Sequence, residues 1–222
     1  MALFPDEPAV AEWRAITVAD LVGLLTDSAP AAPGRPRIVG IDGRSASGKS
    51  TLARRLADEL PGAVVVHTDD LAWWEPYFEW GHLLLAVLSS LHRGESVTLR
   101  PPAWDEHGRE GAIEVPAETP WVIVEGVGAI QRDSQHLLDA RIWVQSDFDE
   151  AERRGQERDI ASGENGDREE SISFWHEWMG HETAYLANER PWELADIVVA
   201  GTDVILLTSG QIAVGQITSD QQ

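Results

Sequence analysis

The chain has 222 residues, of which 43% are hydrophobic, and it carries a formal net charge of -21. A chain this acidic repels nucleic acid and anionic lipid surfaces, so neither is an expected partner. No apolar run approaches the roughly 20 residues of a membrane span, and residues 1–10 lack the basic start of a secretory signal. Cys is absent, which excludes disulfides and thiolate metal sites and fits a cytoplasmic enzyme.

The predicted elements alternate between short apolar strands and amphipathic helices. Residues 1–36 are expected to hold one helix, begun by a capping box at Thr17, and a Pro-rich linker over 29–36. Residues 37–222 are expected to form one domain. Its predicted strands are Arg37–Asp42, Ala63–His67, Trp121–Glu125, Arg141–Gln145 and Asp196–Ala200, and its predicted helices are Gly48–Leu60, Trp80–Arg93, Asp147–Asp159 and Glu169–Leu186.

This alternation is typical of an α/β fold, in which helices cover both faces of a mostly parallel sheet. Two further short strands, Ser96–Arg100 and Ala112–Val115, flank the polar loop 101–111. A hairpin around Thr208-Ser209-Gly210 is expected within residues 204–214.

The octet GRSASGKS, residues 43–50, matches the phosphate-binding pattern G-x-x-x-x-G-K-[ST] without a mismatch. It follows a predicted strand and begins a predicted helix, which is the context that the motif requires. Lys49 is the one lysine of the chain and is expected to reach the β- and γ-phosphates of a nucleoside triphosphate. Ser50 is expected to hold Mg²⁺ and Thr51 to meet the α-phosphate. The backbone of this loop predicts an anion cradle, made by Gly43, Ser45, Ala46, Ser47 and Gly48.

Carboxylates follow two of the predicted strands at their carboxyl ends. Asp69 and Asp70 come after the second strand, and Glu125 ends the strand Trp121–Glu125. In open α/β sheets this edge holds the ligand crevice. One aspartate could accept the proton of an attacking hydroxyl, and Glu125 could hold Mg²⁺. The alternatives are helix capping by Asp69 or Asp70 and a solvated Glu125.

A predicted mobile lid covers residues 153–168. Arg154 and Arg158 lie four residues apart on one helix face, and Gly163 and Gly166 follow them. Such arginines could neutralise a transferring phosphoryl group. The alternative is that Arg153, Arg154 and Arg158 form salt bridges with Asp149, Glu150 or Glu157.

The aromatic and histidine residues permit two interpretations. Five aromatic residues flank the expected pocket and could stack on a ligand; they are Trp73, Trp74, Tyr77, Phe78 and Trp104. For any one of them, packing in the core or at its rim is the alternative. His67, His82 and His92 are interpreted as structural or surface residues. His176 and His181 are five residues apart, so they do not form an i, i+4 metal pair.

Taken together, these residues resemble the uridine kinase and phosphoribulokinase family of P-loop kinases, most closely the uridine/cytidine kinases. The similarity runs from about Arg37 to Gly201. Beyond the phosphate loop it is carried by Thr68-Asp69-Asp70-Leu71, Phe78-Glu79-Trp80, the segment Pro102–Arg109, Val124-Glu125-Gly126, Arg154 to Arg158-Asp159-Ile160, and Leu194–Val199.

The resemblance implies a P-loop NTPase-type fold with a five-stranded parallel sheet, a small β-hairpin over the substrate and an Arg-bearing lid. It implies phosphorylation of a primary hydroxyl by ATP with Mg²⁺. By position, Asp69 is the catalytic base, acting with Lys49 and Arg158, and Ser50 and Glu125 serve Mg²⁺. The implied substrate contacts are Asp69, Tyr77, Trp104, His107 and Arg109.

The chain departs from the family pattern at the substrate contacts. Trp104 stands in place of a Tyr, Glu106 in place of an aromatic residue, and Leu71 in place of a Phe. By the resemblance, the expected acceptor is a uridine- or cytidine-like nucleoside, and the altered contacts make another sugar- or pantothenate-like alcohol the alternative. An ATP-binding regulatory protein without catalysis is the alternative of another class. By analogy alone, a homo-oligomer is an expectation, because related kinases are often dimers or tetramers.

Overall fold

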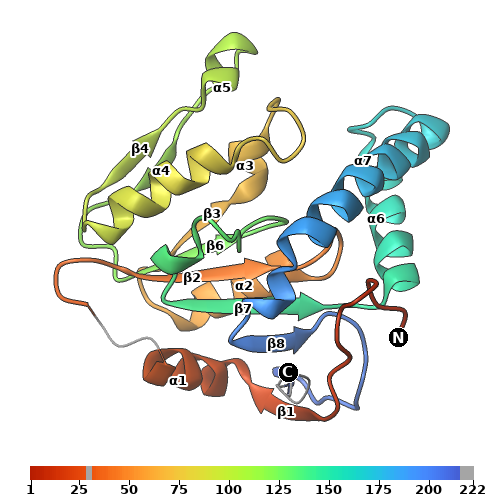
Figure 1. Ribbon diagram of the computed structural model, residues 1–222, viewed down its shortest axis with the longest axis horizontal. Coiled ribbons are helices and arrows are strands. Elements are labelled where there is room, and N and C mark those ends of the chain that lie inside the picture. The colour runs from red at the N-terminus through yellow and green to blue at the C-terminus, as the bar shows by residue number, and fades with distance from the viewer. Residues whose placement is uncertain (29–31, 216–222) are drawn as a thin grey trace.

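The computed structural model describes residues 1–28 and 32–215, and it is built around a seven-stranded sheet with the spatial order β1-β9-β8-β7-β2-β6-β3 (Figure 1). Five neighbouring strands, from β8 to β3, run parallel, which confirms the predicted α/β fold. Strands β9 and β1 extend one edge in the antiparallel sense. The strands are β1 (Trp13–Thr17), β2 (Arg37–Asp42), β3 (Val64–His67), β6 (Trp121–Glu125), β7 (Ala140–Gln145), β8 (Ile197–Ala200) and β9 (Gln211–Gly215).

Helices cover both faces of this sheet, because alternate residues of its strands point to opposite sides. In β2, Ile38 belongs to a buried cluster with Leu84 of α4, whereas Val39 belongs to another with Leu21 of α1 and Leu56 of α2. The helices are α1 (Val18–Ser28), α2 (Lys49–Glu59), α3 (Thr68–Ala72), α4 (Gly81–His92), α5 (Pro102–Glu106), α6 (Phe148–Ser162) and α7 (Arg168–Glu189), with short 3₁₀ turns at Gln135–Leu137 and Pro191–Glu193.

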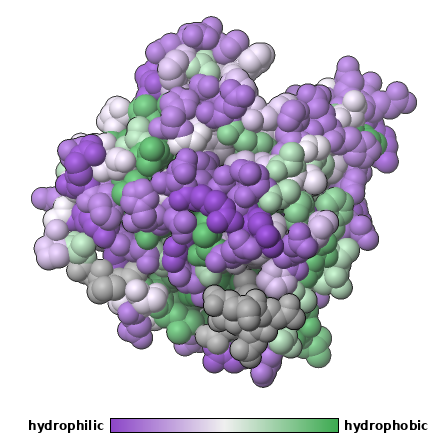
Figure 2. All heavy atoms as spheres, in the orientation of Figure 1, coloured by the Kyte–Doolittle hydropathy of each residue, from purple (hydrophilic) through white to green (hydrophobic). Residues whose placement is uncertain are grey.

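A separate two-stranded sheet forms the predicted hairpin. Strands β4 (Val97–Leu99) and β5 (Ile113–Val115) pair antiparallel, and the predicted polar loop between them contains α5. In Figure 1 the hairpin rises on one side of the molecule and α6 and α7 rise on the other. Figure 2 shows the same two protruding ends, with hydrophilic residues over most of the visible face.

The predicted lid corresponds to α6, a short turn and the start of α7. Helix α6 ends at Gly163, which adopts a left-handed conformation, and α7 begins at Asp167 with a capping box to Glu170. The two helices pack closely where α6 has no side chain, because a Cβ on Gly155 would lie 2.0 Å from the Trp175 ring. Among the described residues, no helix is both long and apolar enough to cross a membrane.

Two expectations for the ends of the chain need correction. Residues 1–36 hold more than the expected helix and linker, because they also contain strand β1, which pairs along its whole length with β9, and Phe4 is buried. The hairpin expected within residues 204–214 does not form, since β9 pairs with β8 and β1 instead. Part of the predicted linker, residues 29–31, and the end of the predicted domain, residues 216–222, lie outside the described residues. The predicted boundary at residue 36 stays a prediction.

Candidate active site

The phosphate loop occupies the turn between β2 and α2, as its motif requires. Gly48 has a φ of +99°, a conformation that other residues rarely adopt, and α2 begins at Lys49. The Lys49 side chain is buried, and its Nζ donates a hydrogen bond to the Arg44 carbonyl at 2.8 Å. The loop is therefore closed around the lysine, with its amide groups at a helix N-terminus that favours anions.

The loop forms the floor of a cavity of about 580 Å³. This cavity brings together most of the predicted catalytic set from five separate parts of the chain. Its polar lining includes Ser45, Lys49, Ser50, Thr51, Asp69, Glu125, Arg154, Arg158 and Asp159. Its apolar lining comes from Val127 and from three aromatic residues of α7, namely Phe174, Trp175 and Trp178. The polar residues, which are far apart in sequence, thus share one space.

Glu125 lies at the end of β6 between two partners. Ser50 Oγ donates a hydrogen bond to Glu125 Oε2 at 3.2 Å, and His67 Nδ1 lies 2.5 Å from Glu125 Oε1. The β3–β6 register places His67 directly opposite Glu125, and this carboxylate raises the pKa of His67. His67 is half-exposed, in agreement with its interpretation as a structural or surface residue, and its ring also contacts the carboxylate that is predicted to hold Mg²⁺.

The oxygen atoms of Ser50 and Glu125 fit Mg²⁺, which is a hard cation that takes few protein ligands. Within residues 1–28 and 32–215, no group of three or more His, Cys, Asp or Glu side chains is placed to hold a metal ion. A site with two protein oxygens suits a cation that completes its shell with water and phosphate oxygens.

Asp69 and Asp70 point to different surroundings, although they are neighbours in α3. Asp69 lines the cavity together with Lys49 and Glu125. Asp70 instead forms a hydrogen-bonded ion pair with Arg109, which comes from the β4–β5 connection. The tertiary structure therefore gives the two carboxylates different surroundings. Asp69 lies beside the phosphate loop, and Asp70 pairs with Arg109.

The predicted substrate residues of the hairpin pack against one another. The Arg109 guanidinium lies 3.8 Å from the Trp104 ring centroid, and Trp104 is buried with its Nε1 donating to the Asp70 carbonyl at 2.9 Å. His107 stacks on Trp74, with 4.0 Å between the ring centroids. Trp104 is thus buried against the Arg109 guanidinium. Direct contact of Trp104, His107 or Arg109 with a substrate stays a prediction.

Tyr77 packs against α7. Its ring stacks on His181 at 4.2 Å between centroids and meets Trp178 edge to face at 5.6 Å. Its hydroxyl donates to Glu177 at 3.3 Å. The predicted contact of Tyr77 with a substrate stays a prediction.

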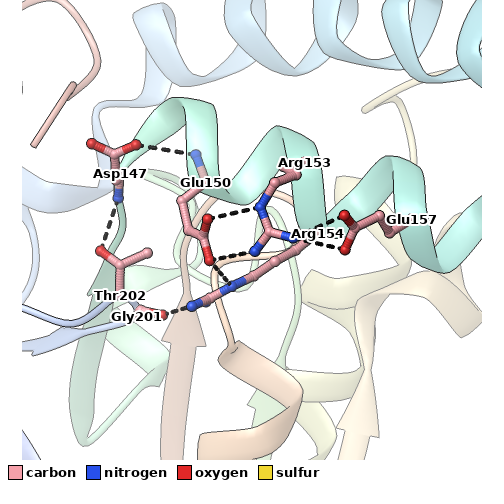
Figure 3. A network of polar contacts seen from close by, with 7 residues as sticks. All are labelled: Asp147, Glu150, Arg153, Arg154, Glu157, Gly201 and Thr202. Carbon is pink, nitrogen blue, oxygen red and sulfur yellow. Dashed lines mark hydrogen bonds and ion pairs between the residues drawn. The ribbon is translucent and has the colours of Figure 1, made fainter.

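The arginines of α6 have different partners, and Figure 3 shows those of Arg153 and Arg154. Arg153 pairs with Glu150 and Glu157, and Arg154 pairs with Glu150, so for both residues the alternative of salt bridges is confirmed. Arg154 lines the cavity while its guanidinium donates to Glu150 and to the Gly201 carbonyl, each at 2.8 Å. Arg158 also lines the cavity and pairs with Asp159 at 2.8 Å. The two predicted lid arginines are therefore the two that reach the cavity.

Helix α7 contributes site residues that sequence reasoning missed. Trp175, Trp178, Glu182 and Leu186 follow one another at helical spacing, and all except Trp178 are fully buried. A carboxylate on such an apolar stripe is a signal that could have been read, because buried acidic residues require a partner. Glu182 meets that requirement by accepting hydrogen bonds from the backbone N–H and the hydroxyl of Ser45 in the phosphate loop.

Asp42 is a second buried carboxylate, at the carboxyl end of β2. It accepts hydrogen bonds from the backbone N–H groups of Gly43 at 2.7 Å, Gly128 at 3.1 Å and Ile130 at 2.9 Å. It thereby joins the start of the phosphate loop to the segment that follows Glu125. Burial raises the pKa of Asp42 from 3.8 to about 7, against the opposing effects of these donors and Lys49.

This pKa predicts a pH dependence of stability. Because the folded state retains a proton that the unfolded chain releases near pH 4, the free energy of unfolding should fall as pH rises from about 4 to 7 and then level off. The slope from this group is about 1.4 kcal/mol per pH unit. Urea unfolding between pH 5 and 7 should show a smaller slope for Asp42→Asn than for the wild type or for the exposed control Asp58→Asn. Equal slopes in all three proteins would contradict the prediction.

Comparisons with known proteins show which proteins the chain resembles as a whole. No protein-family model matches the chain. The chain is 28% identical over 157 residues to a uridine kinase of Aliivibrio salmonicida. The matched region covers 61% of this chain and 72% of that protein. A uridine kinase of Aliivibrio fischeri is 27% identical over the same shares.

Solved structures add the fold. A candidate fructose transport system kinase from Silicibacter sp. has a TM-score of 0.53 and 27% identity, over 81% of this chain and 95% of that one. D-glycerate 3-kinase from Cryptococcus neoformans has a TM-score of 0.55 at 13% identity, over 82% and 94%. The relatives confirm the predicted resemblance and support a phosphotransferase: the chain is similar, in sequence and in fold, to P-loop kinases that act on small molecules.

Proposed function

We propose that this protein transfers the γ-phosphoryl group of ATP to a primary hydroxyl of a small molecule, with Mg²⁺ as cofactor. The observation that carries the proposal is the shared cavity. Asp69 faces the same space as Lys49 of the phosphate loop, with Ser50 and Glu125 beside them. A base, a phosphate cradle and a cation site within one cavity are the parts that phosphoryl transfer requires.

In the proposed reaction, the cradle of residues 43–50 orients the triphosphate, and Thr51 lies where the α-phosphate would be met. Asp69 positions the acceptor hydroxyl and takes its proton as the oxygen attacks the γ-phosphorus. Lys49, Arg154 and Arg158 place positive charge around the phosphoryl group in an otherwise acidic protein. Ser50 and Glu125 would hold Mg²⁺, which when bound neutralises charge on the phosphate oxygens.

For the acceptor we propose a nucleoside of the uridine or cytidine kind, which is the substrate class named for the Aliivibrio relatives. The second candidate is a sugar- or pantothenate-like alcohol. It is favoured by the hairpin contacts, since Arg109 is held by Asp70 and His107 by Trp74 rather than left open for a base. The similarity to a candidate fructose transport system kinase points in the same direction.

An acceptor panel tests the proposal. The purified protein, ATP and Mg²⁺ are incubated with nucleosides, sugars and vitamin alcohols, and release of ADP is followed in a coupled assay. We expect one class to stimulate ADP release, with mass spectrometry showing one added phosphoryl group on the acceptor. ATP binding without stimulation by any acceptor would instead support a regulatory ATP-binding protein.

A further inference from the structure

Glu182 is a buried acid in the part of α7 nearest the phosphate loop. Its side chain has no exposed area, although the chain is so acidic that most of its carboxylates face solvent. Burying a carboxylate is costly unless hydrogen bonds replace its hydration. Glu182 Oε2 accepts from Ser45 N at 3.0 Å, from Ser45 Oγ at 2.5 Å and from Trp178 Nε1 at 3.0 Å. These hydrogen-bond donors to the Glu182 carboxylate thus come from the phosphate loop and from one tryptophan.

These contacts attach α7 to a loop that lies 137 residues earlier in the chain. Trp178 Nε1 also donates to Ser45 Oγ at 2.7 Å, which closes a three-membered network. The neighbouring Arg44 is buried, lies 4.2 Å from the Phe148 ring of α6, and is under the electrostatic influence of Glu182. The first half of the phosphate loop is therefore held by both lid helices.

The other side of Trp178 contacts the segment that follows α3. Its ring lies 5.6 Å from that of Tyr77 and 5.4 Å from that of Phe78, and Phe78 stacks on Tyr185 at 4.2 Å. Phe78 has a φ of +60°, a conformation that costs free energy and persists only where surrounding contacts hold it. This segment, residues 73–80, leads directly from Asp69 and belongs to the acceptor side of the proposed reaction.

We propose that Glu182 is a positioning residue that couples the nucleotide on the phosphate loop to the acceptor side of the site through Trp178. The inference rests on the proposed function and on the prediction from the sequence that Tyr77, within residues 73–80, contacts the acceptor. A triphosphate on the loop restrains Ser45, and Glu182 and Trp178 pass this restraint to Tyr77 and Phe78. Residues 73–80 are then already partly ordered by the nucleotide before the acceptor binds.

Hydrogen exchange tests the coupling without any turnover. Exchange of residues 73–80 is measured with and without Mg²⁺ and β,γ-imido-ATP in the wild type, in Glu182→Gln and in the control Glu169→Gln, which changes an exposed acid of the same helix. We expect the nucleotide to slow exchange about five-fold or more in the wild type and the control. We expect no slowing in Glu182→Gln. Equal slowing in all three proteins would overturn the proposal.

Kinetics with an acceptor from the panel separate positioning from simple stabilisation. Misplacement of reacting groups lowers turnover, so kcat should fall about 10- to 100-fold in Glu182→Gln. The KM for ATP should stay within about three-fold. Unchanged kcat at a temperature where circular dichroism shows a folded variant would contradict the role. If Glu182→Gln does not fold, Trp178→Phe, which retains a ring but removes the Nε1 donor, should show the same loss of coupling in hydrogen exchange.

The two proposals can fail separately. If the wild type binds β,γ-imido-ATP and its segment 73–80 becomes protected, but no acceptor is phosphorylated, the proposed kinase function fails while the coupling remains. If an acceptor is phosphorylated and the protection does not depend on Glu182, the coupling fails while the kinase function remains.

Discussion

Replacement of Asp69 by Asn should reduce phosphoryl transfer about 10³-fold, within the range found for removal of a general base. The change keeps the size of the side chain but removes the carboxylate that lines the cavity beside Lys49 and Glu125. ATP binding should persist, because none of the phosphate-loop groups is altered. The measurements are steady-state kcat with the acceptor found in the panel and calorimetric binding of β,γ-imido-ATP with Mg²⁺.

The matched control is Asp70→Asn, the same chemical change one residue along the chain. Asp70 pairs with Arg109 and does not line the cavity, so this variant should change the KM for the acceptor more than kcat. A full rate in Asp69→Asn together with a lost rate in Asp70→Asn would mean that the base is Asp70. It would also mean that the geometry of α3 differs in the working enzyme.

Replacement of Lys49 by Arg should lower kcat/KM about 100- to 1,000-fold, the usual cost of losing one donor to a transition-state oxyanion. The charge is retained, but Lys49 is buried under the phosphate loop with its Nζ 2.8 Å from the Arg44 carbonyl. A planar guanidinium is too wide for this space and donates along fixed directions. Because Lys49 is the single lysine, an amine-directed reagent has only Lys49 and the N-terminal amine as targets, and ATP protection of Lys49 can be measured on its own peptide.

An Arg→Lys change elsewhere in the site region provides the control for Lys49. Arg153 pairs with Glu150 and Glu157 on α6 and does not line the cavity, so Arg153→Lys should leave kcat/KM within about two-fold of the wild type. Retention of most activity by Lys49→Arg would show that positive charge alone, without the compact ammonium, satisfies the phosphate loop.

Local patterns in the chain were sufficient for the phosphate loop and for the central sheet. The strands β2, β6 and β7 were predicted within about one residue at each end, because a strand buried on both faces reads as an uninterrupted apolar run. The phosphate loop was predicted at Gly43–Ser50 because its geometry depends on neighbours within eight residues. The fold class and the kinase resemblance followed from these elements.

Other features depend on residues that are distant in sequence. The contact of His67 with Glu125 could not be predicted, because the two residues meet only through the β3–β6 register. Glu182 was missed because its donor Ser45 lies on another element, and β1 was missed because β9, its partner, is almost 200 residues away. A local pattern can show that a buried carboxylate such as Glu182 needs a partner, but it does not show which distant residue the partner is.

The sequence by itself determined the phosphate-binding loop, the alternation of strands and helices, the carboxylates that follow β3 and end β6, and the placing of Arg154 and Arg158 on one helix. Each of these is encoded by neighbouring residues, through hydrogen bonding, backbone conformation or apolar periodicity. Only the tertiary structure decided that Asp70 pairs with Arg109, that Trp104 packs against the Arg109 guanidinium, and that α7 is attached to Ser45. Those outcomes depend on how elements pack in three dimensions, since the direction of a side chain is set by the surfaces that it meets.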